Sequence, residues 1–143
     1  MEPKADYRPS LAALVAERAA TNVYQCYQCR RCTSGCALAH HFDLAPNQVV
    51  RAVQLDRRTA LLHSRTIWLC ASCQVCTTRC PQNLDVARVV DVLRIVAQEE
   101  GVPAAVPPVH IFSAAALRSI RAFGRLYELG LMAELYLRLL LAR

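Results

Sequence analysis

All eight cysteines of this 143-residue chain fall into two motifs with the same spacing, C-x2-C-x2-C-x3-C. The first cysteine motif consists of Cys26, Cys29, Cys32 and Cys36, and the second, 44 residues later, consists of Cys70, Cys73, Cys76 and Cys80. Thiolates at this spacing can turn inward from one tight loop onto an inorganic core. The run is typical of four-iron, four-sulfur clusters, as is the proline after its last cysteine, here Pro81. The sequence therefore predicts two [4Fe-4S] clusters and a role in electron transfer.

The two motifs are expected to share their ligands. In two-cluster proteins the fourth cysteine of such a run usually binds the other cluster. We therefore assign Cys26, Cys29, Cys32 and Cys80 to the first cluster, and Cys70, Cys73, Cys76 and Cys36 to the second cluster. Crossed ligation would join the two halves of the domain and keep the clusters close enough for direct electron exchange.

Two alternative uses of the cysteines fit the spacing less well. Zinc usually takes its four thiolates from two separated C-x2-C pairs, whereas each motif here adds a third and a fourth cysteine. A disulfide framework gives no reason for two identical sets of four. Because the opening residues MEPKADYRPS lack the apolar core of a secretory signal and no cysteine lies outside the motifs, we predict a cytoplasmic protein.

The basic character of the chain does not by itself indicate nucleic-acid binding. The formal net charge of +6 counts the cysteines as neutral thiols. A four-iron core with four thiolates carries about −2 when oxidised, so two clusters would bring the total to about +2. The basic residues are scattered, and we predict no nucleic-acid partner. No run of about 20 mostly apolar residues occurs, so we also predict no transmembrane segment.

The hydrophobic spacing predicts helices, and strand patterns are almost absent. The expected helices are residues 11–20 after a Ser10 cap, residues 46–62 from Pro46, and residues 86–100 from an Asp85 cap to Gly101. Gly35 is expected to give conformational freedom to the loop of the first motif. Since 33 residues with a helix among them separate the motifs, the chain is predicted to be an all-α helical ferredoxin. It has two cluster-binding loops and a C-terminal helical extension.

We expect three segments along the chain. Residues 1–20 are a leader with a short helix, residues 21–101 are the two-cluster domain, and residues 102–143 are a proline linker followed by docking helices. The proline linker contains Pro103, Pro107 and Pro108, and the helical part runs over 113–143 with a break at Gly124 or Gly130.

The end of the chain is apolar around most of the helical circumference. The apolar positions are 126, 129, 131, 132, 135, 137, 139, 140 and 141. Glu134 and Arg138 lie four residues apart and can pair. A free surface helix normally has one apolar face, so residues 126–143 are predicted to dock on a partner subunit. The alternative is that this tail folds back onto the chain's own helices.

The first motif also differs from the second in charge. It contains Arg30 and Arg31, where the second has Gln74 and Val75. Positive charge favours the addition of an electron, so we expect the first cluster to have the higher potential. No paired carboxylates, glycine-rich phosphate loop or nucleophile–base pair stands out. We therefore predict no active site of the chain's own and no direct small-molecule substrate.

Three stretches carry a resemblance to a known family. They are CYQCRRCTSGCALA at 26–39, IWLCASCQVCTTRCPQNLDVARVVDVLRIVAQEEGVP at 67–103, and GRLYELGL at 124–131. In these stretches the chain resembles the C subunit of heterodisulfide reductase. One departure is Ala37, where the family usually has proline, and it removes no ligand.

The resemblance implies an electron-transfer subunit of an oxidoreductase complex. In that family the C subunit relays electrons between a flavin-containing A subunit and a B subunit that performs disulfide chemistry at CCG motifs. This sequence has neither a CCG motif nor a flavin fingerprint, so both would come from partners. The alternatives are a free-standing two-cluster ferredoxin, or the iron–sulfur subunit of a related dehydrogenase of the glycolate or glycerol-3-phosphate type.

Overall fold

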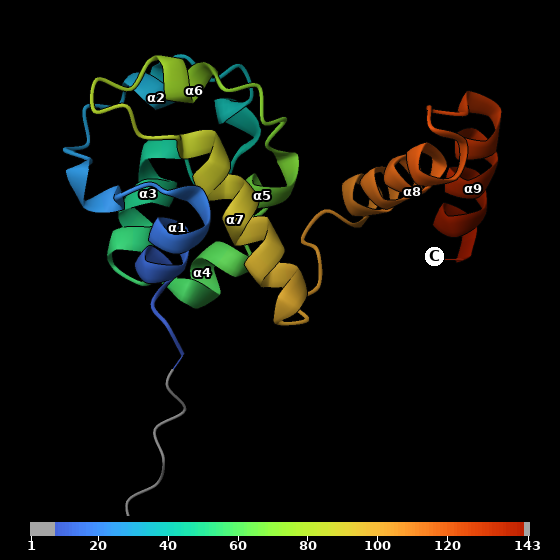
Figure 1. The fold of residues 1–143 in the computed structure, drawn as a ribbon, viewed down its shortest axis with the longest axis horizontal. Helices are drawn as coiled ribbons and strands as arrows, with labels where there is room; N and C mark the ends of the chain where they lie inside the picture. The colour runs from blue at the N-terminus through green and yellow to red at the C-terminus, as the bar shows by residue number, and fades with distance from the viewer. Residues whose placement is uncertain (1–7, 142–143) are drawn as a thin grey trace, which may run out of the picture. The chain divides into compact units, whose positions relative to one another are not determined.

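The computed structural model describes residues 8–141 and divides the chain into two compact units, 1–103 and 104–143. The first seven residues of the predicted leader lie outside the described residues. The first unit contains α1 (Leu11–Ala19), η1 (Val23–Gln25), α2 (Arg31–Ser34), η2 (Ala39–His41), α3 (Pro46–Gln54), α4 (Arg58–Leu62), α5 (Thr66–Leu69), α6 (Val75–Thr78) and α7 (Val86–Glu99). The second contains α8 (Pro107–Phe123) and α9 (Glu128–Leu141). Residues 8–141 contain no strand (Figure 1), and the all-α prediction is confirmed.

The core of the first unit forms around α7. Its apolar stripe includes Val89, Leu93 and Val96, which are almost fully buried, and α1, α3, α4 and α5 all pack against it. Burying side chains of this size contributes about 1.5–3 kcal/mol each. The predicted caps are present, since Ser10 accepts from the Ala13 N–H and Asp85 accepts from the Arg88 N–H. Helix α1, which the sequence analysis set apart from the two-cluster segment, thus belongs to this unit.

The single helix predicted over 46–62 is wrong, because α3 ends at Gln54 and α4 begins at Arg58. Asp56 lies between them with φ +48, in the left-handed region that interrupts a helix. Its carboxylate accepts from the Leu11 N–H at 2.8 Å, which satisfies one of the free donors at the start of α1. The break therefore serves a contact between segments 45 residues apart.

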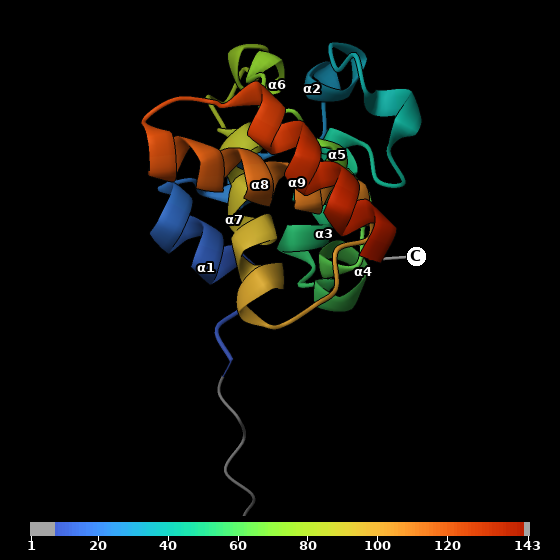
Figure 2. The same ribbon diagram turned by 90° about the vertical axis from the view of Figure 1, so that its right-hand side faces the viewer.

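The two cysteine loops lie together at one end of the first unit. Helix α2 of the first loop contacts α6 of the second, and both views of the fold show them side by side (Figures 1 and 2). Asp43 connects the segments that lead out of one loop and into the other. Its carboxylate accepts from the hydroxyls of Ser64 and Thr66, each at 2.6 Å, and from the backbone N–H of Arg65 at 2.8 Å.

The second unit is a pair of helices packed against each other. Helix α8 begins at Pro107, so the prediction that Pro107 and Pro108 belong to a linker is wrong. Proline fits the first turn of a helix because the N–H it lacks would be unbonded there. Of the two predicted break points, Gly124 is the one used, with φ +69. Within residues 8–141 no helix is long and apolar enough to cross a membrane.

Candidate iron–sulfur centre

The two cysteine loops repeat in backbone conformation as they do in sequence. Gln28 and Arg30 have positive φ in the first loop, and Ser72 and Gln74, each 44 residues later, have positive φ in the second. Each loop then forms one short helical turn, α2 or α6, immediately before its fourth cysteine. Alternation of left- and right-handed residues turns successive N–H groups to the inside of a loop, where they can bind anionic sulfur. The loops are therefore built to surround negatively charged groups.

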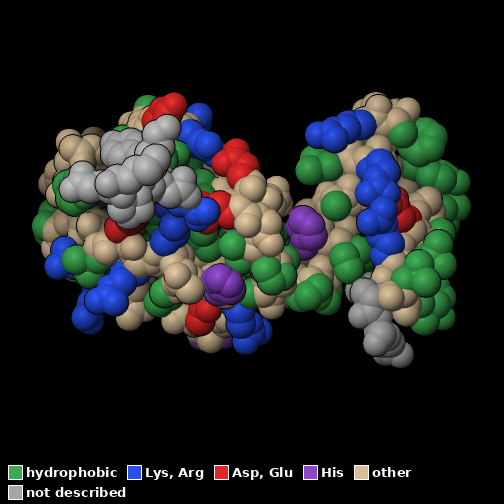
Figure 3. Space-filling view, turned by 90° about the horizontal axis from the view of Figure 1, so that it is seen from below, with side chains coloured by type: hydrophobic (Ala, Val, Ile, Leu, Met, Phe, Trp, Pro, Cys, Tyr) green, Lys and Arg blue, Asp and Glu red, His purple; other side chains and the backbone are tan. Residues whose placement is uncertain are grey.

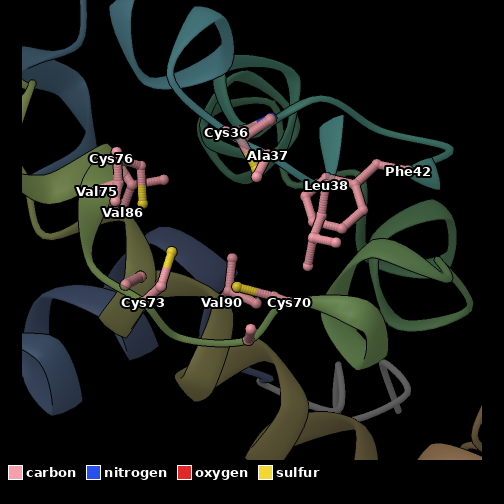
Figure 4. A pocket seen from close by; sticks show the side chains of 13 residues that line it. Cys36, Ala37, Leu38, Phe42, Cys70, Cys73, Val75, Cys76, Val86 and Val90 are labelled. Carbon is pink, nitrogen blue, oxygen red and sulfur yellow. The ribbon is translucent and has the colours of Figure 1, made fainter. Parts of the chain in front are cut away.

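One cavity brings together cysteines of both motifs. It has a volume of about 270 Å³ and is lined by Cys70, Cys73 and Cys76 of the second motif and by Cys36 of the first. The sulfurs of these four side chains point towards the same space (Figure 4). The rest of the lining is apolar and comes from the segment after the first motif and from α3, α6 and α7, and includes Leu38, Phe42, Pro46, Val86 and Val90.

The donor set and the cavity fit a polynuclear iron–sulfur core. Four thiols are the ligands that such a core requires, and they surround a volume instead of converging on a point. A single zinc ion needs its four sulfurs about 2.3 Å from one centre. No group of three cysteine, histidine or acidic side chains within the described part of the chain is arranged to hold a single metal ion.

The cavity also sets the protonation of its thiols. Burial raises the pKa of the Cys70 thiol, and burial together with the nearby Cys70 raises the pKa of Cys76 to about 11. Without metal these thiols hold their protons at neutral pH. Metal ligation requires thiolates, so loading the site would release protons and become more favourable as the pH rises.

The remaining four cysteines do not line this cavity. In this set Cys26 lies near enough to Cys32 to help raise the pKa of its thiol, although burial is the main cause. Cys29 is exposed and Cys80 is half-buried. The structure thus places Cys36 among the cysteines of the second motif, whereas the assignment of Cys80 to the first motif continues to rest on the sequence repeat.

The two loops touch through the residues just before their fourth cysteines. A Cβ on Gly35 would lie 2.5 Å from Arg79 Cδ, which leaves no room for a side chain while Arg79 keeps its position. Gly35 has φ −96, an ordinary value for any residue. The expectation that Gly35 provides conformational freedom is therefore wrong, and its role is to allow the close approach of Arg79.

Several polar residues that the sequence analysis did not single out hold the loops in place. Thr33 and Thr77 occupy equivalent positions, directly after the third cysteine of each motif. Thr33 donates to Asn47 Oδ1 at 2.7 Å, and Thr77 donates to Asp85 Oδ1 at 2.9 Å. Each loop is thereby attached to the N-terminus of the helix that follows it, α3 or α7. The 44-residue repeat could have revealed the two threonines, but their partners lie at unequal distances along the chain.

Arg94 supports the second loop from α7. Its guanidinium donates to the carbonyl oxygens of Ile67 and Cys70 at 2.7 and 2.9 Å. It also lies 3.4 Å from Asp91, whose carboxylate accepts from the Ser72 hydroxyl. This one side chain therefore fixes the backbone on which the second motif begins.

Comparison with known proteins agrees with this geometry. Residues 25–85, which include all eight cysteines, match the family model of a 4Fe-4S dicluster domain. This chain contains a 4Fe-4S dicluster domain. The match begins one residue before the first cysteine and ends at the cap of α7, so it coincides with the two cysteine loops and the helices between them.

Curated relatives of the dicluster domain are C subunits of heterodisulfide reductases. The chain is 40% identical over 78 residues to the C subunit of the ferredoxin:CoB-CoM heterodisulfide reductase of Methanosarcina acetivorans, which is 54% of this chain and 31% of that protein. It is 28% identical over 100 residues to the iron–sulfur C subunit of Methanopyrus kandleri, covering 67% and 52% of the two chains. With the C 2 subunit of Methanocaldococcus jannaschii the identity is 30% over 88 residues, 62% and 47%. The chain thus spans between a third and about half of the length of these relatives, and it is their homologue over the dicluster domain.

Proposed function

We propose that this chain is the electron-transfer subunit of a heterodisulfide-reductase-like complex. It relays electrons through two [4Fe-4S] clusters between an A-type flavin subunit and a B-type subunit with CCG domains. The observation that carries the proposal is the cavity in which four thiols from both motifs face one apolar space. A buried site with thiol ligands and no general acid or base is suited to electron transfer and to no bond-making chemistry of its own. Because thiols must stay reduced to bind iron, the cytoplasm is the compartment that suits it.

The proposed ligand sets cross between the motifs. Cys36 belongs with Cys70, Cys73 and Cys76, and the placement of these four around one cavity supports this set. By the repeat, Cys80 belongs with Cys26, Cys29 and Cys32. The contact between Gly35 and Arg79 brings the two neighbouring fourth cysteines to the same border between the loops, as an exchange of ligands requires.

The helical pair α8–α9 is the proposed docking element for the B-type subunit. Leu131 is buried in the unit, but Leu129, Met132 and Tyr136 are between 63% and 76% exposed. Exposed apolar side chains also lie on α8, at Phe112, Leu117, Ile120 and Phe123. Figure 3 shows apolar side chains gathered on this unit beside a stripe of basic groups. A contiguous patch of this kind marks an interaction surface, and it favours a subunit over a free-standing ferredoxin.

The pairing of Glu134 was predicted and is present. Arg138 lies 2.9 Å from its carboxylate, and Arg118 of α8 pairs with it from the other side. These ion pairs use the polar positions of α9 within the helical pair. The apolar positions that remain exposed are therefore the ones left for a partner.

The test of the relay is iron content and turnover. The anaerobically reconstituted chain should bind eight irons and eight sulfides and accept electrons from dithionite. By itself it should reduce no heterodisulfide. Four irons per chain, stoichiometric zinc, or turnover of a disulfide substrate by this chain alone would each contradict the proposal.

The test of the partner uses surface variants in the full-length chain. Leu129→Glu and Met132→Glu should abolish co-purification with the co-expressed B-type subunit while iron content stays unchanged. The matched control is Ile95→Glu, which changes an exposed apolar residue of α7 in the first unit. Equal retention of the partner by all three variants would show that α9 is not the docking surface.

A further inference from the structure

A chain of side-chain hydrogen bonds ends on a sulfur of the first cysteine motif. Thr33 donates its hydroxyl to Asn47 Oδ1 at 2.7 Å, and Asn47 Nδ2 donates to Gln28 Oε1 at 3.0 Å. Gln28 Nε2 then donates to Cys26 Sγ at 3.3 Å. Because the Gln28 oxygen is occupied by Asn47, only one orientation of the Gln28 amide satisfies the chain, and it places the NH2 group on the sulfur.

The surroundings hold this donor in position before any metal binds. Asn47 is only 8% exposed and is the second residue of α3, and its own N–H donates back to Thr33 Oγ1 at 3.2 Å. Gln28 lies between the first two cysteines of the motif with φ +62, so the loop itself points its side chain inward. Donors linked in one direction polarise each other, which strengthens the last bond in the chain.

The second motif lacks this arrangement. Ser72 stands 44 residues after Gln28, and its hydroxyl donates to the carboxylate of Asp91 at 2.8 Å instead of to a cysteine. Thr77, the equivalent of Thr33, donates to the carboxylate of Asp85. Carboxylates therefore stand near the second motif where the first has amides. Arg94 offsets only part of this difference, because it pairs with Asp91 and is otherwise bonded to backbone carbonyls.

We propose that Gln28 raises the reduction potential of the cluster bound at Cys26, so that an electron entering the chain resides on the first cluster in preference to the second. The inference rests on the proposed function, since it requires both clusters. Reduction adds one electron, and the extra negative charge spreads onto the sulfurs, where an N–H donor stabilises it. Gln28 acts through the Cys26 sulfur and is a positioning residue. The charges of Arg30 and Arg31 act in the same direction.

The experiment is an EPR-monitored redox titration of the reconstituted full-length chain, with dithionite as the reductant. Gln28→Met keeps the length of the side chain and removes the donor. It should lower the potential of the higher-potential step by about 60 mV, which is about a tenfold change in the one-electron equilibrium. Ser72→Ala is the matched control, because it removes a hydroxyl from the equivalent position that donates to no cysteine, and it should leave that step unchanged.

A second variant changes the relay without touching the motif. Asn47→Asp replaces the NH2 group that fixes the Gln28 oxygen, and it should lower the same step as Gln28→Met. Unchanged potentials in both variants would overturn the inference, and so would a loss of iron in both, because a residue that tunes potential is not needed for assembly. A wild-type chain that binds eight irons but shows no such shifts refutes the role of Gln28 alone. A wild-type chain without eight irons refutes the proposed function.

Discussion

Four residues other than glycine, Gln28, Arg30, Ser72 and Gln74, adopt positive φ in the cysteine loops. Each such residue costs of order 1–3 kcal/mol of backbone strain. This strain is repeated at equivalent places in the two motifs, where it curls each loop so that its cysteines face inward. At the scale of single residues, therefore, the loops are held in an unfavourable conformation by their contacts with α3 and α7, and the ligands are arranged before iron arrives.

Cys36 and Cys80 provide the sharpest residue-level test of the proposed ligand exchange. Cys36→Ser should damage the cluster held by the second motif, because Cys36 lines the cavity of Cys70, Cys73 and Cys76. Cys80→Ser should damage the other cluster. The measurement is the EPR signal that each variant loses. Loss of the same signal in Cys36→Ser and in a first-motif variant such as Cys29→Ser would show that the ligands do not cross.

Asp43 should control stability and its dependence on acid. Burial works to raise the pKa of this carboxyl, but hydrogen bonds from Ser64, Thr66 and the Arg65 N–H outweigh it and hold the pKa well below its usual range. A carboxyl whose folded pKa is depressed stabilises the fold above its unfolded pKa, about 3.9, and loses that effect as the pH falls through the folded value.

The corresponding variant is Asp43→Asn, which keeps the size of the side chain and removes its charge. It should cost about 1–2 kcal/mol at neutral pH, at the lower end for bonds to a charged group because the carboxylate is partly exposed. Denaturant titrations followed by visible absorbance would measure this difference. It should shrink as the pH is lowered below about 4, and a difference that grows with acid would contradict the assignment.

At the scale of elements, short helices act as fasteners between the cysteine loops and the longer helices. The four-residue helices α2 and α6 cannot be stable alone, because nucleating a helix costs more than one turn returns. They exist because Thr33 and Thr77 attach them to the N-termini of α3 and α7. The interrupted helix at Asp56 follows the same principle, since a contact with α1 prevails over local helix propensity.

Arg94 gives the prediction at this scale. Its planar guanidinium donates to two backbone carbonyls of the second loop at once, and lysine cannot reproduce that geometry. Arg94→Lys should lose about 1–2 kcal/mol and release iron to a chelator faster than wild type. Arg88→Lys, an exposed change on the same helix, is the control. Equal rates of iron loss in the two variants would exclude Arg94 as a support of the loop.

At the scale of the whole molecule, the chain consists of two units with separate tasks. The first unit holds all eight cysteines and its own buried core. Among its described residues, the second unit buries only Ala115 and Ser119 of α8 and Leu131 of α9. So small a core is expected to be marginal by itself, which is consistent with a helical pair completed by a partner.

A chain that ends at Pro103 should therefore keep both clusters. We expect its iron content and visible spectrum to equal those of the full-length chain, and its co-purification with the B-type subunit to be lost. The deletion also removes exposed apolar surface, so the shortened chain should aggregate less in size-exclusion chromatography. If the truncated chain cannot bind iron, the second unit contributes to the cluster domain and the division of tasks is wrong.

The sequence by itself determined the cofactor class and the helical class of the fold. Cysteine spacing within a loop is a local property, and so is the 3.6-residue periodicity that predicted α1 and α7. Capping by Ser10 and Asp85 was predictable for the same reason, because a cap and its acceptor site lie within one turn. The Glu134–Arg138 pair was predictable from its spacing of four residues.

Only the tertiary structure decided which residues meet across the chain. Asp56 breaks a helix to reach Leu11, Gly35 makes room for Arg79, and Asn47 orients Gln28 towards Cys26. None of these pairs has a fixed separation in sequence, so no periodicity marks them. Long-range contacts of this kind depend on how the helices pack around α7, and that packing is a sum over the whole core instead of a property of any one segment.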